Sequence, residues 1–203
     1  MSAMGRPPQG PLVPPGNRLA FRLIRHGSPI GTHTLDFKQV DDGLEVRIAV
    51  EAVVRLGPIP LFHYRHTALE VWHGGQVAEV RSRTDRNGTE LAMQAMRVPA
   101  GLAAEGTGTP RYVAPADALA TTYWNRQILR VPLVGTQDGG LVHPRVTDRG
   151  TEMRRTASGA PLPVRVWQLS GDLDLTLYYD ADAQWAGMKF TVADGSEVTY
   201  ERL

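Results

Sequence analysis

Apolar and polar residues alternate with a period of two along much of this chain. Across residues 44–54, every second position is Leu, Val, Ile or Ala, and Glu45, Arg47 and Glu51 lie between them. Residues 172–180, DLDLTLYYD, follow the same pattern. Because successive side chains of a strand point to opposite faces, the alternation predicts antiparallel strands with one buried face and one solvated face.

Short turns that contain Gly, Asp or Asn separate these runs, and such residues tolerate the positive φ angles of tight hairpins. The clearest are Asp41-Asp42-Gly43, His73-Gly74-Gly75, Arg86-Asn87-Gly88, Asp138-Gly139-Gly140, Asp180-Ala181-Asp182 and Ala193-Asp194-Gly195. Strands joined by hairpins pair with their neighbours in sequence. We therefore predict an all-β fold, a single antiparallel meander of about ten to twelve strands. So many twisted strands should curl into a barrel-like or folded-over sheet.

Two regions depart from the alternation. Five prolines in the first fifteen residues predict a disordered Pro-rich arm over residues 1–17, followed by a single β domain over residues 18–203. Within that domain, residues 99–126 are predicted to be an insertion. Its first part, up to Pro115, is rich in Pro, Gly and Ala and favours a long loop. The stretch from Asp117 to Asn125 then favours one short helix.

Composition narrows the class of partner. The chain has 22 Lys and Arg residues against 21 Asp and Glu residues, so its charge gives no reason to expect nucleic acid. It has no run of about 20 apolar residues, so no membrane span is predicted. With no cysteine, disulfides and thiolate chemistry are excluded.

Candidate site residues gather on one predicted strand, residues 61–72. One of its faces carries Tyr64, His66, Glu70 and Trp72, a mixture of aromatic and titratable groups that is typical of a pocket lining. The alternative is that these are amphipathic boundary residues where the strand passes from core to rim.

His33 raises the same question in the segment SPIGTHTLDF, because it shares a strand face with Leu35 and Phe37. A buried imidazole without a partner costs about 1–3 kcal/mol. We therefore predict that His33 faces the inside of the sheet and hydrogen-bonds Glu70, Tyr64 or a ligand.

Three further candidates, Tyr123, Trp124 and Asn125, form a dense polar and aromatic patch. They are predicted either to cap an opening in the sheet or to plug its core. Tyr179 and Asp180 end a strand just before a turn, where Asp180 is a candidate partner for a histidine or for the turn backbone. No two of the six histidines stand two residues apart, and no nucleotide-binding or nucleophile motif is present. We predict no metal site and no cofactor.

Four short segments carry a family resemblance: IGTH (30–33), EVW (70–72) with the following Gly74-Gly75, YWN (123–125), and Tyr179-Asp180 with Asp194-Gly195. Together they resemble a bacterial family known only as a domain of unknown function, over most of residues 19–203. The resemblance implies a β-rich fold, export to the periplasm and no defined activity. A cytoplasmic location is the alternative, since the first residues lack the apolar core of a signal peptide.

The function predicted first is binding of an apolar or amphiphilic small molecule in a curled, lipocalin-like β-sheet pocket. By fold analogy, this binding is predicted to take place in the cell envelope. One alternative is an enzyme in which His33 or His66 is a general base oriented by Glu70 or Asp180. Another is a structural or assembly role in the envelope. The predicted site consists of His33, Tyr64, His66, Glu70, Trp72, Tyr123, Trp124, Asn125, Tyr179 and Asp180, and the catalytic residues and the oligomeric state stay unassigned.

Overall fold

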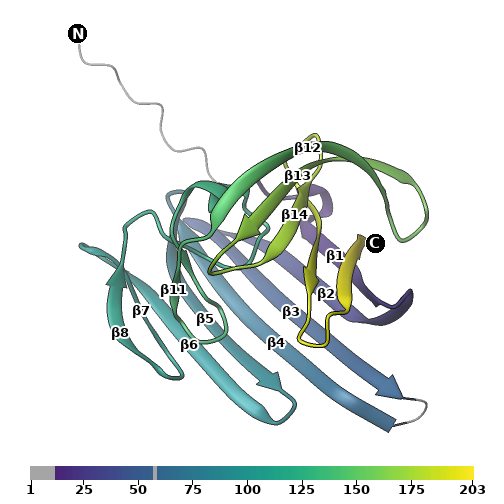
Figure 1. Ribbon diagram of the computed structural model, residues 1–203. Helices are drawn as coiled ribbons and strands as arrows, with labels where there is room; N and C mark the ends of the chain where they lie inside the picture. Colours follow the sequence, from purple (N-terminus) through teal and green to yellow (C-terminus); the bar gives the residue numbers. More distant parts are fainter. Residues whose placement is uncertain (1–11, 57–58) are drawn as a thin grey trace.

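The computed structural model describes residues 12–56 and 59–203, and within them the chain is almost entirely β-structure (Figure 1). Two short 3-10 helices, η1 (Pro15–Asn17) and η2 (Arg126–Arg130), accompany the strands. The strands are β1 (Arg18–Arg25), β2 (Ser28–Val40), β3 (Gly43–Leu56), β4 (Ile59–His73), β5 (Gln76–Arg86), β6 (Thr89–Val98), β7 (Gly101–Gly106), β8 (Thr109–Ala114), β9 (Leu119–Ala120), β10 (Leu133–Val134), β11 (Leu141–Val142), β12 (Arg145–Arg155), β13 (Pro161–Ser170), β14 (Leu175–Tyr179), β15 (Trp185–Thr191) and β16 (Glu197–Arg202). These 16 strands exceed the predicted ten to twelve, because three are two-residue bridges and two lie in the predicted loop.

Thirteen strands form one antiparallel sheet in the order β12-β13-β14-β15-β16-β1-β2-β3-β4-β5-β6-β7-β8. The predicted antiparallel meander is confirmed, with β16 returning to pair with β1. The end strands β8 and β12 do not pair with each other in the described residues, so the sheet is curled but not closed. In Figure 1 the strands β12–β14 arch over the broad array of β1 to β6.

The strand register aligns the inward side chains in rows across the sheet. One row runs from Phe21 through His33, Val50 and His66 to Thr84, each directly opposite the next on the neighbouring strand. All five are buried. We call the side of the sheet that carries this row the inner face. It holds the main hydrophobic core, to which β14, β15 and β16 also contribute.

An insert, residues 115–143, covers part of the inner face. Its apolar residues Leu119, Trp124, Ile128 and Leu133 belong to the same core as the sheet. Its three short strands form a separate sheet in the order β11-β10-β9, in which β9 and β10 are parallel. The insert therefore fills the space that a curled sheet would otherwise leave to solvent.

The predicted helix near Asp117 to Asn125 is wrong in position. Leu119 and Ala120 pair with Leu133 and Val134 instead, which commits the backbone of this stretch to a sheet. Helical turns begin only after Asn125, whose side-chain oxygen accepts a hydrogen bond from the Gln127 amide at 3.0 Å. Asn is a favoured helix cap because its side chain can satisfy an amide that lacks a helical partner.

The predicted loop before Pro115 is also wrong, because β7 and β8 form a hairpin there. Leu102 and Ala104 are buried in the core, and Gly108 supplies the positive φ of 76° that the turn requires. Of the predicted arm, residues 1–11 lie outside the described residues. The part from Leu12 onward is ordered in the structure, since Val13 packs against the core and η1 leads into β1.

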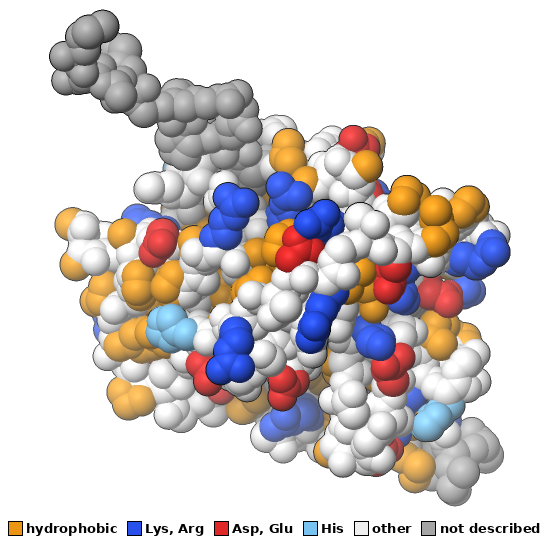
Figure 2. Space-filling view, turned by 45° about the horizontal axis from the view of Figure 1, so that its top comes forward, with side chains coloured by type: hydrophobic (Ala, Val, Ile, Leu, Met, Phe, Trp, Pro, Cys, Tyr) orange, Lys and Arg blue, Asp and Glu red, His pale blue; other side chains and the backbone are white. Residues whose placement is uncertain are grey.

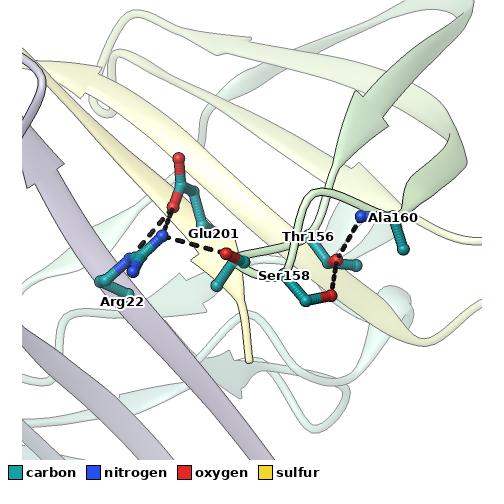
Figure 3. A network of polar contacts seen from close by, with 6 residues as sticks. Arg22, Thr156, Ser158, Ala160 and Glu201 are labelled. Atoms are coloured by element: carbon teal, nitrogen blue, oxygen red, sulfur yellow. Dashed lines mark hydrogen bonds and ion pairs between the residues drawn. The ribbon is translucent and has the colours of Figure 1, made fainter.

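The β12–β13 hairpin turns back onto the outer face of β1 and β16 (Figure 3). Arg22 donates to Glu201 Oε2, with its Nη2 at 2.7 Å, and also to the Ala157 carbonyl at 3.3 Å. Within the turn, the Thr156 hydroxyl contacts the Ser158 hydroxyl and accepts from the Ala160 amide. These contacts fasten one end of the sheet to its middle.

Candidate functional site

His33 lies at the centre of a group of aromatic rings on the inner face. Its imidazole centroid is 5.2 Å from the Trp185 ring, 5.6 Å from the Tyr200 ring and 6.2 Å from the Phe21 ring. β2 supplies His33 and β1 supplies Phe21, whereas Trp185 and Tyr200 come from β15 and β16. The pairing of β1 with β16 therefore brings residues from both ends of the chain against one histidine. We call these four residues and Tyr64, His66, Tyr123 and Tyr179 the His33 cluster.

His33 is only 5% exposed, yet neither of its ring nitrogens has a hydrogen-bond partner among the described residues. Burial lowers the pKa of His33 to about 3, and the nearby His66 adds to the effect. The imidazole is therefore neutral at neutral pH and presents one N–H donor and one acceptor nitrogen. The sequence-based prediction of an inward His33 is confirmed, but neither Glu70 nor Tyr64 is its partner.

His66 lies in the same row as His33, with Val50 between them. Its Nδ1 is 2.8 Å from the Thr84 hydroxyl, and its ring stacks on Tyr64 with centroids 6.4 Å apart. Burial lowers the pKa of His66 to about 4 and raises the pKa of Tyr64 to about 12. Both groups are therefore uncharged at neutral pH.

Tyr123 joins the insert to this cluster. Its backbone has a φ of 66°, a left-handed conformation that is uncommon for a bulky residue. The Tyr179 hydroxyl donates to the Tyr123 carbonyl at 2.7 Å, and the Tyr123 and Trp185 rings lie 6.1 Å apart. Burial raises the pKa of Tyr123, Tyr179 and Tyr200, so their phenols are neutral too. Strained backbone of this kind is characteristic of functional sites, where the surrounding contacts hold it.

Glu70 forms a second polar group on the inner face, which we call the Glu70 clasp. Its Oε2 accepts from the indole nitrogens of Trp124 at 2.8 Å and Trp72 at 3.0 Å, and its Oε1 accepts from the Thr122 hydroxyl at 2.7 Å. Burial raises the pKa of Glu70, and the three donors act in the opposite direction. Since Thr122 and Trp124 belong to the insert and Trp72 to β4, the clasp fastens the insert to the sheet.

Two predicted site residues have local structural roles. Asp180 accepts the amides of Asp182 and Gln184 in the β14–β15 turn and binds Arg202 Nη1 at 2.6 Å. Asn125 caps η2, as described above, and its side-chain nitrogen is buried without a partner among the described residues.

The structure thus divides the predicted site in two. His33, Tyr64, His66, Tyr123 and Tyr179 meet in the His33 cluster, and Glu70, Trp72 and Trp124 meet in the clasp. Neither His33 nor His66 contacts Glu70 or Asp180 within the described part of the chain. The geometry therefore does not provide the His–carboxylate pair on which the catalytic alternative depends.

Sequence reasoning missed Trp185, Tyr200 and Thr122. Tyr200 follows the alternation in EVTYE, which could have placed it on the same face as Val198. Nothing local points to Trp185 or Thr122, because their roles arise from strands and loops that are distant in sequence.

The described residues contain no group of three or more His, Asp or Glu side chains placed to hold a metal ion. None of their helices has the length and apolar character to cross a membrane.

Comparison with known proteins identifies a matching family model and a solved structure of similar fold. A family model described as "Domain of unknown function (DUF6134)" matches residues 21–203, which confirms the resemblance to an uncharacterised β-rich family. A solved structure, a β-barrel-like protein of the domain of unknown function DUF1849 from Brucella abortus, superposes with a TM-score of 0.61. It shares 8% sequence identity, over 92% of this chain and 95% of that chain, so the likeness concerns the fold alone. No curated protein is similar in sequence.

Proposed function

Because this chain belongs to the DUF6134 family, whose description names no activity, we propose a function from its geometry: the His33 cluster binds an amphiphilic small molecule through an uncharged polar group. The observation that carries the proposal is the pair of buried, unpartnered ring nitrogens of His33. A ligand that offers a hydroxyl or amide would satisfy one nitrogen or both. It would thereby offset a desolvation cost of about 1–3 kcal/mol.

The surroundings of His33 favour an apolar body on that ligand. Phe21, Trp185 and Tyr200 surround the imidazole with aromatic surface. Pockets for small molecules combine such apolar walls with a few placed polar groups. The phenol of Tyr64 and the imidazole of His66, two strands away, supply additional polar atoms in the same region.

An uncharged polar group is favoured by the electrostatics of the cluster. Burial keeps His33, His66 and the tyrosines of this cluster neutral. An ionic ligand would lose its hydration there without a charged partner, which is unfavourable by several kcal/mol. This argues for an alcohol, amide or ester over a free acid or an amine.

The test combines native mass spectrometry of gently purified protein with a titration by 1-decanol, followed by tryptophan fluorescence. Trp185 lies 5.2 Å from His33 and reports on the cluster. We expect His33→Phe and His33→Gln to weaken 1-decanol binding about tenfold, the effect of one lost hydrogen bond. His143→Gln, which changes an exposed histidine, is the matched control and should bind as the wild type does.

Two results would contradict the proposal. One is 1-decanol binding that is equally strong in both His33 variants. The other is no binding of 1-decanol and no retained molecule, a result that would favour the structural role. Location in the periplasm stays a prediction from the family resemblance.

A further inference from the structure

A hollow of about 460 Å³ lies between η2 and the strand pair β12–β13. The helix contributes Arg126, Leu129 and Arg130 to its lining, and β13 contributes Trp167. It opens beside the irregular part of β12, where the register with β13 shifts between Asp148 and Thr151. Its volume is within the usual range for small-molecule pockets.

The charges around the hollow are unbalanced. Asp148 is neutralised by Arg165, whose Nε lies 2.9 Å and 3.0 Å from its two oxygens, and Asp180 is paired with Arg202. Arg126 and Arg130 have no ion-pair partner among the described residues, and both are exposed. Two guanidinium groups therefore remain without a counter-ion at the edge of one hollow, where an anion would stabilise both.

The wall of the hollow adds an apolar surface. Trp167 and Leu129 are partly buried against the main core and also line the hollow. Their side chains therefore offer a ligand an apolar contact in the same hollow as the two arginines.

We propose that this hollow is a second ligand site, which binds a molecule that carries a carboxylate or phosphate group beside an apolar body. Arg126 and Arg130 hold the anionic group, and Trp167 and Leu129 contact the apolar part. Arginine suits this role because its planar fork of donors matches the oxygens of both anions. The site shares no residue with the His33 cluster, so it stands or falls independently of the function proposed above.

The experiment titrates the full-length protein with three probes: decanoate below its micelle concentration, 1-decanol and inorganic phosphate. Binding is followed by calorimetry and by tryptophan fluorescence, with Trp167→Phe identifying the part of the signal that comes from the hollow. We expect decanoate to bind more tightly than phosphate. We also expect the double variant Arg126→Gln/Arg130→Gln to weaken decanoate binding by about tenfold or more, as for loss of a charged hydrogen bond.

A second double variant controls for net charge. Arg83 and Arg111 line a broader hollow over β3–β8, whose lining contains no aromatic side chain. The variant Arg83→Gln/Arg111→Gln removes the same number of charges and should leave decanoate binding unchanged. His33→Phe should also leave it unchanged, which separates this site from the His33 cluster.

Three outcomes would overturn the inference. The first is an equal loss of decanoate affinity in the two arginine double variants, which would indicate general electrostatic attraction. The second is phosphate binding as tightly as decanoate, which would deny the apolar wall a role. The third is 1-decanol competing with decanoate at equal affinity, which would deny a role to the charge. Because both η2 arginines are exposed, their variants should fold, and thermal unfolding checks this.

Discussion

At the scale of single residues, the inner face holds two buried polar groups with opposite environments. Glu70 receives three hydrogen bonds, whereas His33 receives none from the described residues. A carboxylate with a full set of donors stabilises the arrangement around it, but an unpartnered imidazole is a local cost. This contrast favours a structural role for Glu70, and it is the observation that supports the ligand-binding role proposed for His33.

The acid stability of the protein should depend on His33. Its folded pKa of about 3 lies below the unfolded value of 6.5, so between these values the unfolded chain binds more protons. Stability that is present above about pH 6.5 is therefore lost as the pH falls toward 3. We expect His33→Phe to lose less stability than the wild type between about pH 7 and about pH 4.5, measured by urea unfolding.

The comparison cancels the other groups that titrate in this range. His66 acts in the same direction as His33, and the raised pKa of Glu70 acts in the opposite direction, but both are present in the two proteins. An identical loss of stability in wild type and variant would show that His33 is not held neutral by burial.

The clasp predicts a sharp response to Glu70→Met. The thioether has a similar length, but it removes the oxygens that accept from the indole nitrogens of Trp72 and Trp124. These two buried N–H groups would then lack an acceptor. We expect a loss of about 1–3 kcal/mol in the free energy of unfolding for each of them. Glu90→Met, at an exposed position, should change stability little, and equal stabilities of the two variants would refute the role of the clasp.

At the scale of elements, two kinds of segment behave differently. The long strands β2 to β6 follow their own alternation, because one face of each is buried over its central residues. The insert does not follow local preference, since the parallel pairing of β9 with β10 depends on a partner 14 residues away, Leu119 opposite Leu133. Its conformation is set by the core that it covers.

The close approach of β2 and β3 at Gly31 can be tested by substitution. A Cβ atom at this position would lie 1.9 Å from the Glu51 carbonyl oxygen and 2.7 Å from Ala52 Cα, both of them backbone atoms. Gly31→Ala must therefore push the two strands apart next to His33. We expect a loss of about 1–3 kcal/mol in stability, measured by thermal or urea unfolding. Thr32→Ala, on the exposed face of the same strand, is the control, and an equally mild effect of both changes would contradict this account.

At the scale of the whole molecule, the sheet is joined where the two ends of the chain meet. β1 pairs with β16, and Phe21 lies opposite Arg202. One core cluster includes residues from both halves of the sheet, so neither half has a hydrophobic core of its own on the inner face. Charged side chains of both signs are interspersed over the face shown in Figure 2, in keeping with the net charge of +1. Because β16 is the neighbour of β1 in the sheet, the last strand supplies backbone hydrogen bonds that the first strand needs.

Removal of residues 197–203 should therefore prevent cooperative folding. It deletes β16, leaves β1 and β15 with unpaired edges, and removes the buried Val198 and Tyr200 from the core. We expect aggregation in size-exclusion chromatography and loss of a cooperative thermal transition, because exposed apolar strand edges promote association. A control that lacks only Leu203, which is 65% exposed, should fold. A monomeric, cooperatively folding form without β16 would contradict this view of the sheet.

Local sequence determined most of the strands and the orientation of their side chains. The period of two placed His33, Tyr64, His66 and Glu70 on the inner face, because a strand side chain has only two directions in which to point. It also located five of the hairpin turns through their Gly, Asp and Asn residues. The two short strands of the β7–β8 hairpin were missed, since a stretch rich in Gly, Pro and Ala has weak alternation.

Tertiary structure decided which of these inward residues meet. Glu70 accepts hydrogen bonds from Trp124 and Thr122, more than fifty positions away in the sequence. His33 contacts the rings of Trp185 and Tyr200, which lie near the far end of the chain. Such contacts depend on the pairing of β1 with β16 and on the position of the insert over the sheet, and the period of a single segment predicts neither of them. The hollow at η2 has the same origin, since the arginines of the insert and Trp167 of β13 approach each other only after the sheet has curled. Alternation sets a face, whereas the curvature of the whole sheet sets the neighbours on that face.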